Sequence, residues 1–63
     1  MIGEIIRKWR QENGISQQAL AEMCGVHRTL IARYETGKIE PNMSTLAKLS
    51  DAMHIPVSAF FGK

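Results

Sequence analysis

The chain has 63 residues, of which 44% are apolar, and its formal net charge is +2. A domain this small buries only about 60% of the surface that its unfolded chain exposes, so its apolar residues are needed for a core and leave little for a deep substrate pocket. The single cysteine, Cys24, excludes an intrachain disulfide, and no segment is apolar enough for a signal peptide or a membrane span. We therefore expect one cytoplasmic domain, residues 1–63, that is not an enzyme and has no membrane partner.

The first segment has the pattern of an amphipathic helix. Its apolar residues recur at intervals of three and four and fill an arc of about 100° on a helical wheel: Ile2, Ile5, Ile6 and Trp9. The polar and charged residues between them point the other way. The helix should end at Asn13-Gly14, because glycine readily adopts the left-handed conformation that stops a helix.

Two further helices are expected on either side of Gly25. Ser16 is a favourable N-cap and begins a helix of about two turns that ends at Gly25. The next helix begins near His27, runs from Arg28 to Glu35 and ends at Gly37. Only about three residues, one of them glycine, separate these helices, and such a short connection favours the sharp crossing of a helix-turn-helix.

The rest of the chain predicts two more short helices and no strand. Asn42 is the expected N-cap of the fourth helix, which has an apolar face and ends near His54. Pro56 begins the fifth helix, which carries Phe60 and Phe61. Two adjacent aromatic residues cannot both point inward from one helix, so one is expected to cover the core and the other to support a dimer contact. The sequence thus predicts an all-α, five-helix domain.

The third helix has two opposed faces. On a helical wheel one side is apolar, with Leu30, Ile31 and Tyr34, and the other side carries Arg28, Thr29, Ala32 and Arg33. The apolar side can pack on a small core while the other side presents two arginines outward. Because arginine can bond guanine O6 and N7 together, and threonine can contact a base edge or a thymine methyl, this second face suits a DNA major groove. An ordinary solvated surface is the alternative.

The order of these features resembles the phage Cro/repressor helix-turn-helix family, also called XRE-like. The resemblance extends from Ile2 to Phe61 and rests on three motifs: Ser16-Gln17-Gln18-Ala19-Leu20-Ala21, then Cys24-Gly25-Val26, then Ile31-Ala32-Arg33-Tyr34-Glu35-Thr36-Gly37-Lys38 with Pro41. It implies a compact five-helix repressor-like domain that binds double-stranded DNA sequence-specifically with its third helix in the major groove. It also implies a transcriptional regulator of the repressor type.

The resemblance implies a role for particular side chains. Base contacts would come from the outward face of the third helix: Arg28, Thr29 and Arg33. Phosphate contacts would come from residues around that helix: Gln17, Lys38, Arg10, His27 and Asn42. Members of the family often pair a basic residue late in the first helix with the Glu that ends the third, so a pair between Arg10 and Glu35 is expected to orient Arg10 near the DNA backbone. Two separate solvated charges are the alternative.

The sequence departs from the family pattern at several caps. His27 stands where the third helix usually has a Ser or Thr N-cap, and it either contacts DNA or is a solvated, weakly capping residue. Ala19 replaces the acid that would complete a capping box at Ser16. His54 replaces the usual glycine after the fourth helix, and Pro56 replaces a capping serine. His54 and Pro56 bear on stability rather than on binding.

Other chemistry finds little support in the sequence. Cys24, His27 and His54 are the only good zinc ligands, whereas a structural site needs four, so no metal is expected and Cys24 is interpreted as a small core residue. No nucleophile, base and acid are placed to share a cleft, and no glycine-rich phosphate loop is present, so neither catalytic residues nor cofactors are expected.

The expected partner is double-stranded DNA, bound by a homodimer. A lone domain contacts few bases, and such domains usually bind two half-sites about one helical turn apart. No separate dimerisation domain is seen within the chain. The alternative function is a protein-interaction module, such as an antitoxin-like domain that binds a partner protein, and the modest net charge is compatible with it.

Overall fold

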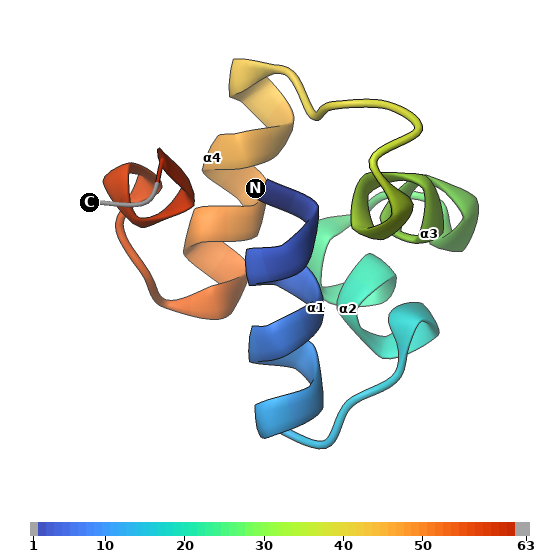
Figure 1. Cartoon of the computed structure of the whole chain (residues 1–63). Coiled ribbons are helices and arrows are strands. Elements are labelled where there is room, and N and C mark those ends of the chain that lie inside the picture. The colour runs from blue at the N-terminus through green and yellow to red at the C-terminus, as the bar shows by residue number, and fades with distance from the viewer. Residues whose placement is uncertain (1, 62–63) are drawn as a thin grey trace.

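Four α-helices and one short 3₁₀-helix make up the structure, a computed structural model that describes residues 2–61. In chain order these are α1 (Ile2–Glu12), α2 (Gln17–Cys24), α3 (Arg28–Thr36), α4 (Met43–Met53) and η1 (Val57–Phe61). α1 lies between α3 on one side and η1 on the other, and α2 packs against α3 and α4 (Figure 1). Within residues 2–61 there is no strand, and no helix is long and apolar enough to cross a membrane.

The helix boundaries follow the capping residues that the sequence indicates. Ser16 Oγ accepts a hydrogen bond from the Ala19 amide at 3.0 Å, which satisfies one of the free N–H groups at the start of α2. Gly25 and Gly37 end α2 and α3 in the left-handed region, at φ of 72° and 77°. The predicted ends of the first three helices are therefore confirmed to within one or two residues.

The last helix differs from the prediction. Val57–Phe61 is a 3₁₀-helix and not an α-helix, with the Ala59 amide donating to Pro56 O at 3.0 Å. Five residues gain too few i→i+4 hydrogen bonds to offset the cost of starting an α-helix, whereas a 3₁₀ turn closes with fewer residues. The fold is therefore all-helical as predicted, but with four α-helices and a 3₁₀ turn in place of five helices.

The core forms where the helices meet. Its buried residues come from all five elements: Ile6, Leu20, Ala21, Cys24, Ile31, Tyr34, Leu46, Leu49, Met53 and Phe60. In α3 the apolar face is directed inward as predicted, with Ile31 and Tyr34 buried and Leu30 half-buried. Cys24 is buried, as its interpretation as a core residue requires, and the loss of hydration raises the pKa of its thiol.

The contact between α1 and α3 depends on a glycine that belongs to none of the sequence motifs described above. Gly3 is buried, and a Cβ atom added to it would lie 2.0 Å from the backbone oxygen of Tyr34. Any side chain at this position would therefore push α1 away from the end of α3. The close approach matters for the site described next, because it brings the first and third helices together beside Glu35.

Candidate nucleic-acid interface

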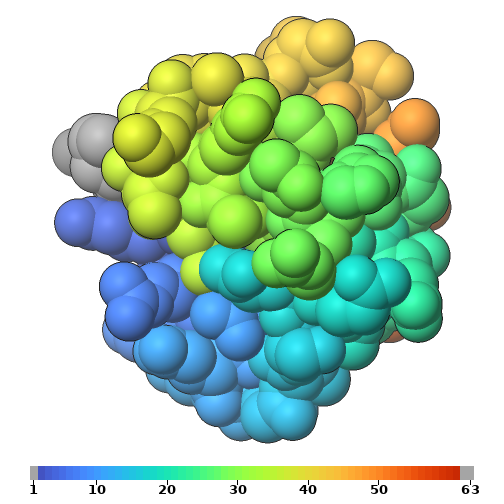
Figure 2. Space-filling view, turned by 90° about the vertical axis from the view of Figure 1, so that its right-hand side faces the viewer, coloured from blue at the N-terminus to red at the C-terminus, as the bar shows by residue number. Residues whose placement is uncertain are grey.

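The outward face of α3 carries two arginines without partners. Arg28 and Arg33 are exposed, and Thr29 and Ala32 between them are half-buried. Neither arginine side chain forms a hydrogen bond or an ion pair with another residue of the described chain. Figure 2 shows the residues of α3 across the middle of this face, with residues of α2 below them and of the loop after α3 above. The structure thus brings the predicted base-contacting residues together on one accessible surface.

His27 provides the N-cap of α3. Its Nδ1 accepts a hydrogen bond from the Thr29 amide at 3.1 Å, in place of the Ser or Thr oxygen usual in the family. An accepting Nδ1 carries no proton, so in the neutral ring the proton is on Nε2. The imidazole is exposed. His27 therefore holds the first turn of α3, with Arg28 and Thr29, and presents an N–H donor to solvent.

Glu35, at the other end of α3, accepts two hydrogen bonds from Arg10. Arg10 Nε lies 2.7 Å from Glu35 Oε2, and Nη2 lies 3.1 Å from Oε1. The two side chains are only 15% and 4% exposed. The hydrogen bond to Glu35 raises the pKa of Arg10 above its ordinary value. The predicted pair between Arg10 and Glu35 is confirmed, and its parallel geometry makes it a charge-assisted, bidentate interaction.

The same carboxylate also holds Gln17. Gln17 Nε2 donates to Glu35 Oε1 at 3.1 Å, and Arg10 Nη1 donates to the backbone oxygen of Ile15 at 3.0 Å. Glu35 therefore joins α1, the start of α2 and the end of α3. The family resemblance implies that Gln17 faces a phosphate, and it does not imply this bond to Glu35. An amide nitrogen has two hydrogens, so the second one remains available to another acceptor.

Two predicted phosphate contacts lie in the loop that follows α3. Lys38 is exposed and its ammonium group has no partner within the described residues, while its backbone amide donates to Arg33 O at 3.0 Å. Asn42 is exposed and caps α4, with Oδ1 accepting from the Thr45 amide at 2.9 Å. This bond leaves the Asn42 amide nitrogen free to donate. Glu40, which lies between them in the sequence, is exposed and carries the opposite charge to Lys38.

The comparisons with known proteins agree with this geometry. A family model described as helix-turn-helix matches residues 6–60. The chain belongs to the helix-turn-helix family. It is 42% identical over 55 residues to YonR, an HTH-type transcriptional regulator derived from the SPbeta prophage of Bacillus subtilis (strain 168), covering 87% of the chain and 51% of that protein. It is 37% identical over 57 residues to control protein C.SmaI of Serratia marcescens, covering 90% of the chain and 68% of that protein.

Solved structures support the same relationship. The P22 c2 repressor, in a crystal structure with a synthetic operator, superimposes with a TM-score of 0.90 at 35% identity, over 95% of this chain and 91% of that chain. The resemblance to phage repressors noted from the sequence is confirmed. The chain spans about half the length of the YonR protein, so this similarity concerns the helix-turn-helix region.

Proposed function

We propose that this chain binds double-stranded DNA sequence-specifically and regulates transcription as a repressor, with α3 in the major groove. The observation that carries the proposal is the outward face of α3, where Arg28 and Arg33 are exposed and have no partner within the described residues. Two exposed arginines without partners contribute little to the stability of the free protein. When the helix enters a major groove, their guanidinium groups can bond guanine O6 and N7. The P22 c2 repressor, of the same fold, is described in complex with an operator.

Specific recognition would come from three side chains of α3. Arg28 and Arg33 would each bond a guanine, and Thr29 would contact a base edge or a thymine methyl. Half-buried Ala32 lies among them, so a small side chain would let the helix approach the base pairs closely. These three contacts are the part of the interface that would carry sequence information.

The phosphate contacts would surround α3 on both sides. His27 would donate through Nε2, Gln17 through the amide hydrogen that Glu35 leaves free, and Asn42 through its amide nitrogen. Lys38 would add a full positive charge. All three guanidinium nitrogens of Arg10 already donate a hydrogen bond, two to Glu35 and one to Ile15 O. Arg10 would therefore support DNA binding by holding Glu35 and Gln17 in place and by donating its remaining N–H groups to a phosphate.

We further propose that residues 1–63 form a single DNA-binding domain that works in the cytoplasm as a homodimer on DNA. Half-sites read by a helix-turn-helix dimer lie about 34–36 Å apart, centre to centre. The described chain measures 27 × 23 × 18 Å, so two copies fit side by side on one face of the duplex. The α3 helices of the two copies would then lie in two successive turns of the major groove.

The proposal is tested by titrating the protein against random duplex DNA at two salt concentrations and then selecting bound sequences from a random pool. We expect binding that weakens steeply with salt, and a selected motif with two related halves about one helical turn apart. If no DNA is bound at low salt, the proposal fails, and a protein-interaction module becomes the better interpretation.

A further inference from the structure

Two small side chains, Ala32 and Thr36, lie between the arginines on the outward face of α3. With about 100° per residue, Ala32 and Thr36 are about 40° and 80° around the helix from Arg28, and Arg33 is about 140° from it. Ala32 is half-buried and Thr36 is exposed. Both residues therefore belong to the surface that the proposed function directs at the bases.

The hydroxyl group of Thr36 is already used within α3. Its Oγ1 donates to the backbone oxygen of Ala32 at 3.2 Å and to that of Arg33 at 3.3 Å, so one hydrogen is shared with the preceding turn. The hydroxyl of Thr29, on the same face, has no such bond within the described residues. Thr36 thus has no donor left to offer a base, and its γ-methyl group is the part of the side chain that stays free of hydrogen bonds.

Arg28 and Arg33 extend beyond this pair of small residues. Both arginines are exposed and without partners within the described residues, and an arginine side chain is several bonds longer than alanine or threonine. When the two guanidinium groups bond guanine O6 and N7, the base edges between them meet the methyl groups of Ala32 and Thr36. A base edge with a donor or an acceptor at that place would lose water without gaining a partner, which is unfavourable.

We propose that Ala32 and Thr36 contact the C5 methyl groups of thymines that lie next to the guanines bonded by Arg28 and Arg33. This methyl is the apolar group that a base projects into the major groove. Ala32 and Thr36 are one turn apart, about 6 Å along the helix axis, and bases stack about 3.4 Å apart, so the two thymines lie at most about two base-pair steps apart. The inference rests on the proposed function and adds these two residues to the three base-contacting side chains.

Replacing thymine by deoxyuridine tests the contact, because it removes the C5 methyl and leaves the hydrogen-bonding groups of the base in place. The probe is the duplex selected from the random pool, with its thymines replaced one at a time. Burying one methyl group corresponds to about a fourfold change in the dissociation constant. We expect a loss of about that size at two thymines of each half-site, and no loss at thymines outside the half-sites.

Two variants of Thr36 separate the effect of its methyl from that of its hydroxyl. Thr36→Ser removes the methyl but keeps the hydroxyl that bonds the preceding turn, so it should bind the thymine and deoxyuridine duplexes equally at one of the two positions. Thr36→Val keeps a methyl and removes the hydroxyl, so it should retain the fourfold difference there. The opposite pattern would mean that the hydroxyl contacts the DNA, and would overturn the proposal.

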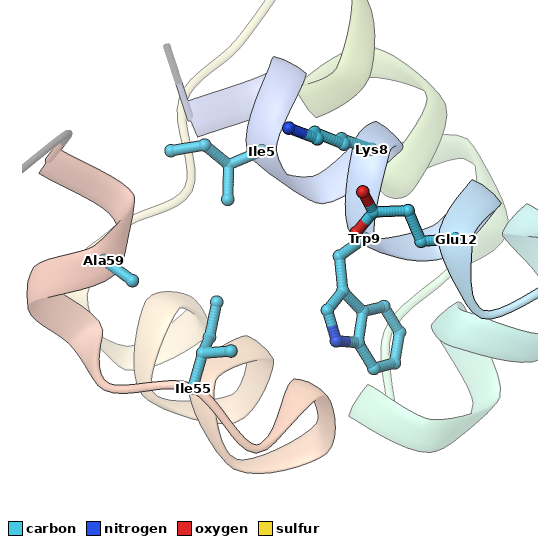
Figure 3. Close-up of a pocket in the computed structure, with 6 residues that line it drawn as sticks. All are labelled: Ile5, Lys8, Trp9, Glu12, Ile55 and Ala59. Atoms are coloured by element: carbon cyan, nitrogen blue, oxygen red, sulfur yellow. The ribbon is translucent and has the colours of Figure 1, made fainter.

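Ala32→Gly removes the other methyl group, and Ala59→Gly is its matched control. Ala59 is also half-buried, and it lines an apolar groove with Ile5, Trp9 and Ile55 (Figure 3). This groove lies between α1 and η1, whereas α3 packs on the other side of α1 (Figure 1). We expect Ala32→Gly to lose the difference at the second thymine and Ala59→Gly to keep it at both. Circular dichroism checks that both variants are folded.

The outcomes separate the methyl contacts from DNA binding itself. If the wild type binds the selected duplex and every deoxyuridine duplex equally, the methyl contacts are refuted and the proposed function stands. If folded Thr36→Ser and Ala32→Gly discriminate like the wild type, other residues contact the methyl groups and the assignment is wrong. If the wild type binds no duplex, the proposed function and the methyl contacts are refuted together.

Discussion

Removing the Glu35 carboxylate is expected to destabilise the domain strongly. Glu35→Ala deletes the acceptor of three hydrogen bonds, two from Arg10 and one from Gln17. A hydrogen bond to a charged group contributes about 1.5–3 kcal/mol to the free energy of unfolding, and removing one partner of a buried ion pair costs about 3–5 kcal/mol. Arg10 is 15% exposed and keeps its bond to Ile15 O, so water and that carbonyl compensate part of the loss. We therefore expect a loss of about 2–3 kcal/mol in the free energy of unfolding.

This loss is large for a chain of 63 residues. Each 1 kcal/mol lowers the melting temperature of a domain of this size by about 4–8 °C, so Glu35→Ala should melt about 10–20 °C below the wild type. Urea unfolding followed by circular dichroism measures the free energy directly, and an unchanged slope would show that the extent of unfolding is the same. Arg10→Ala should lose a similar amount, and the double variant should show a coupling of roughly 2 kcal/mol.

Glu22→Ala is the matched control for this experiment. Glu22 is an exposed acid that accepts a hydrogen bond from Gln18 Nε2 at 2.9 Å, one helical turn away. Such an exposed pair contributes about 0.2–0.5 kcal/mol. If Glu35→Ala costs no more than Glu22→Ala, the hydrogen bonds of Glu35 to Arg10 and Gln17 do not hold the three helices together.

Single substitutions elsewhere test the base contacts, the end of α4 and the contact between α1 and α3. Arg28→Ala and Arg33→Ala should each cost about 1–3 kcal/mol of binding free energy at particular base pairs of a selected site. Lys38→Ala should instead weaken binding evenly across sequences and lower the salt slope by about 1. Binding curves on single-base variants of the site test this, and equal losses at every base for all three variants would mean that α3 does not read the bases. His54 adopts a left-handed φ of 57°, which is unfavourable for a residue other than glycine. His54→Gly should therefore raise the free energy of unfolding by about 0.5–1 kcal/mol. An unchanged urea midpoint would show that the left-handed cap of α4 is not strained. Gly3→Ala improves helix propensity, yet it should lower the free energy of unfolding by about 1–2 kcal/mol, because the added Cβ would lie 2.0 Å from Tyr34 O. A higher free energy of unfolding in the urea assay would mean that α1 and α3 separate easily.

Local patterns were sufficient to predict most of the fold. Each cap is a short-range interaction that the sequence displays directly, so Ser16, Gly25, Gly37 and Asn42 mark helix ends that the structure places within one or two residues. The apolar face of α3 follows from the helical period alone. The type of the last helix could not be predicted in this way, since proline and two phenylalanines are compatible with either an α-helix or a 3₁₀ turn and only length and packing decide between them.

Contacts between distant residues were harder to predict. The Arg10–Glu35 pair was expected only because the family resemblance implies it. Nothing in the sequence shows that Gly3 touches the backbone of Tyr34, because a glycine in a helical segment is equally compatible with an exposed, merely tolerated position. The bond from Gln17 to Glu35 is likewise invisible in sequence, since it depends on the crossing angle of two helices joined by a turn.

The distribution of charge explains how a chain with a net charge of only +2 can bind DNA. Glu35 and Arg10 form an ion pair within the domain, so the pair adds no net charge to the attraction for phosphates, and Arg10 would contribute only through its remaining N–H groups. The positive charge that remains near α3 comes from Arg28, Arg33 and Lys38, which have no partners within residues 2–61. Each phosphate charge offset by a Lys or Arg cation contributes about −0.9 to the slope of log K against log salt, so Lys38 at the backbone and the two arginines in the groove should together give a slope of about −2 to −3 for one domain, and a dimer about twice that value. A slope near zero would mean that these three residues do not reach the DNA, whatever the net charge of the chain.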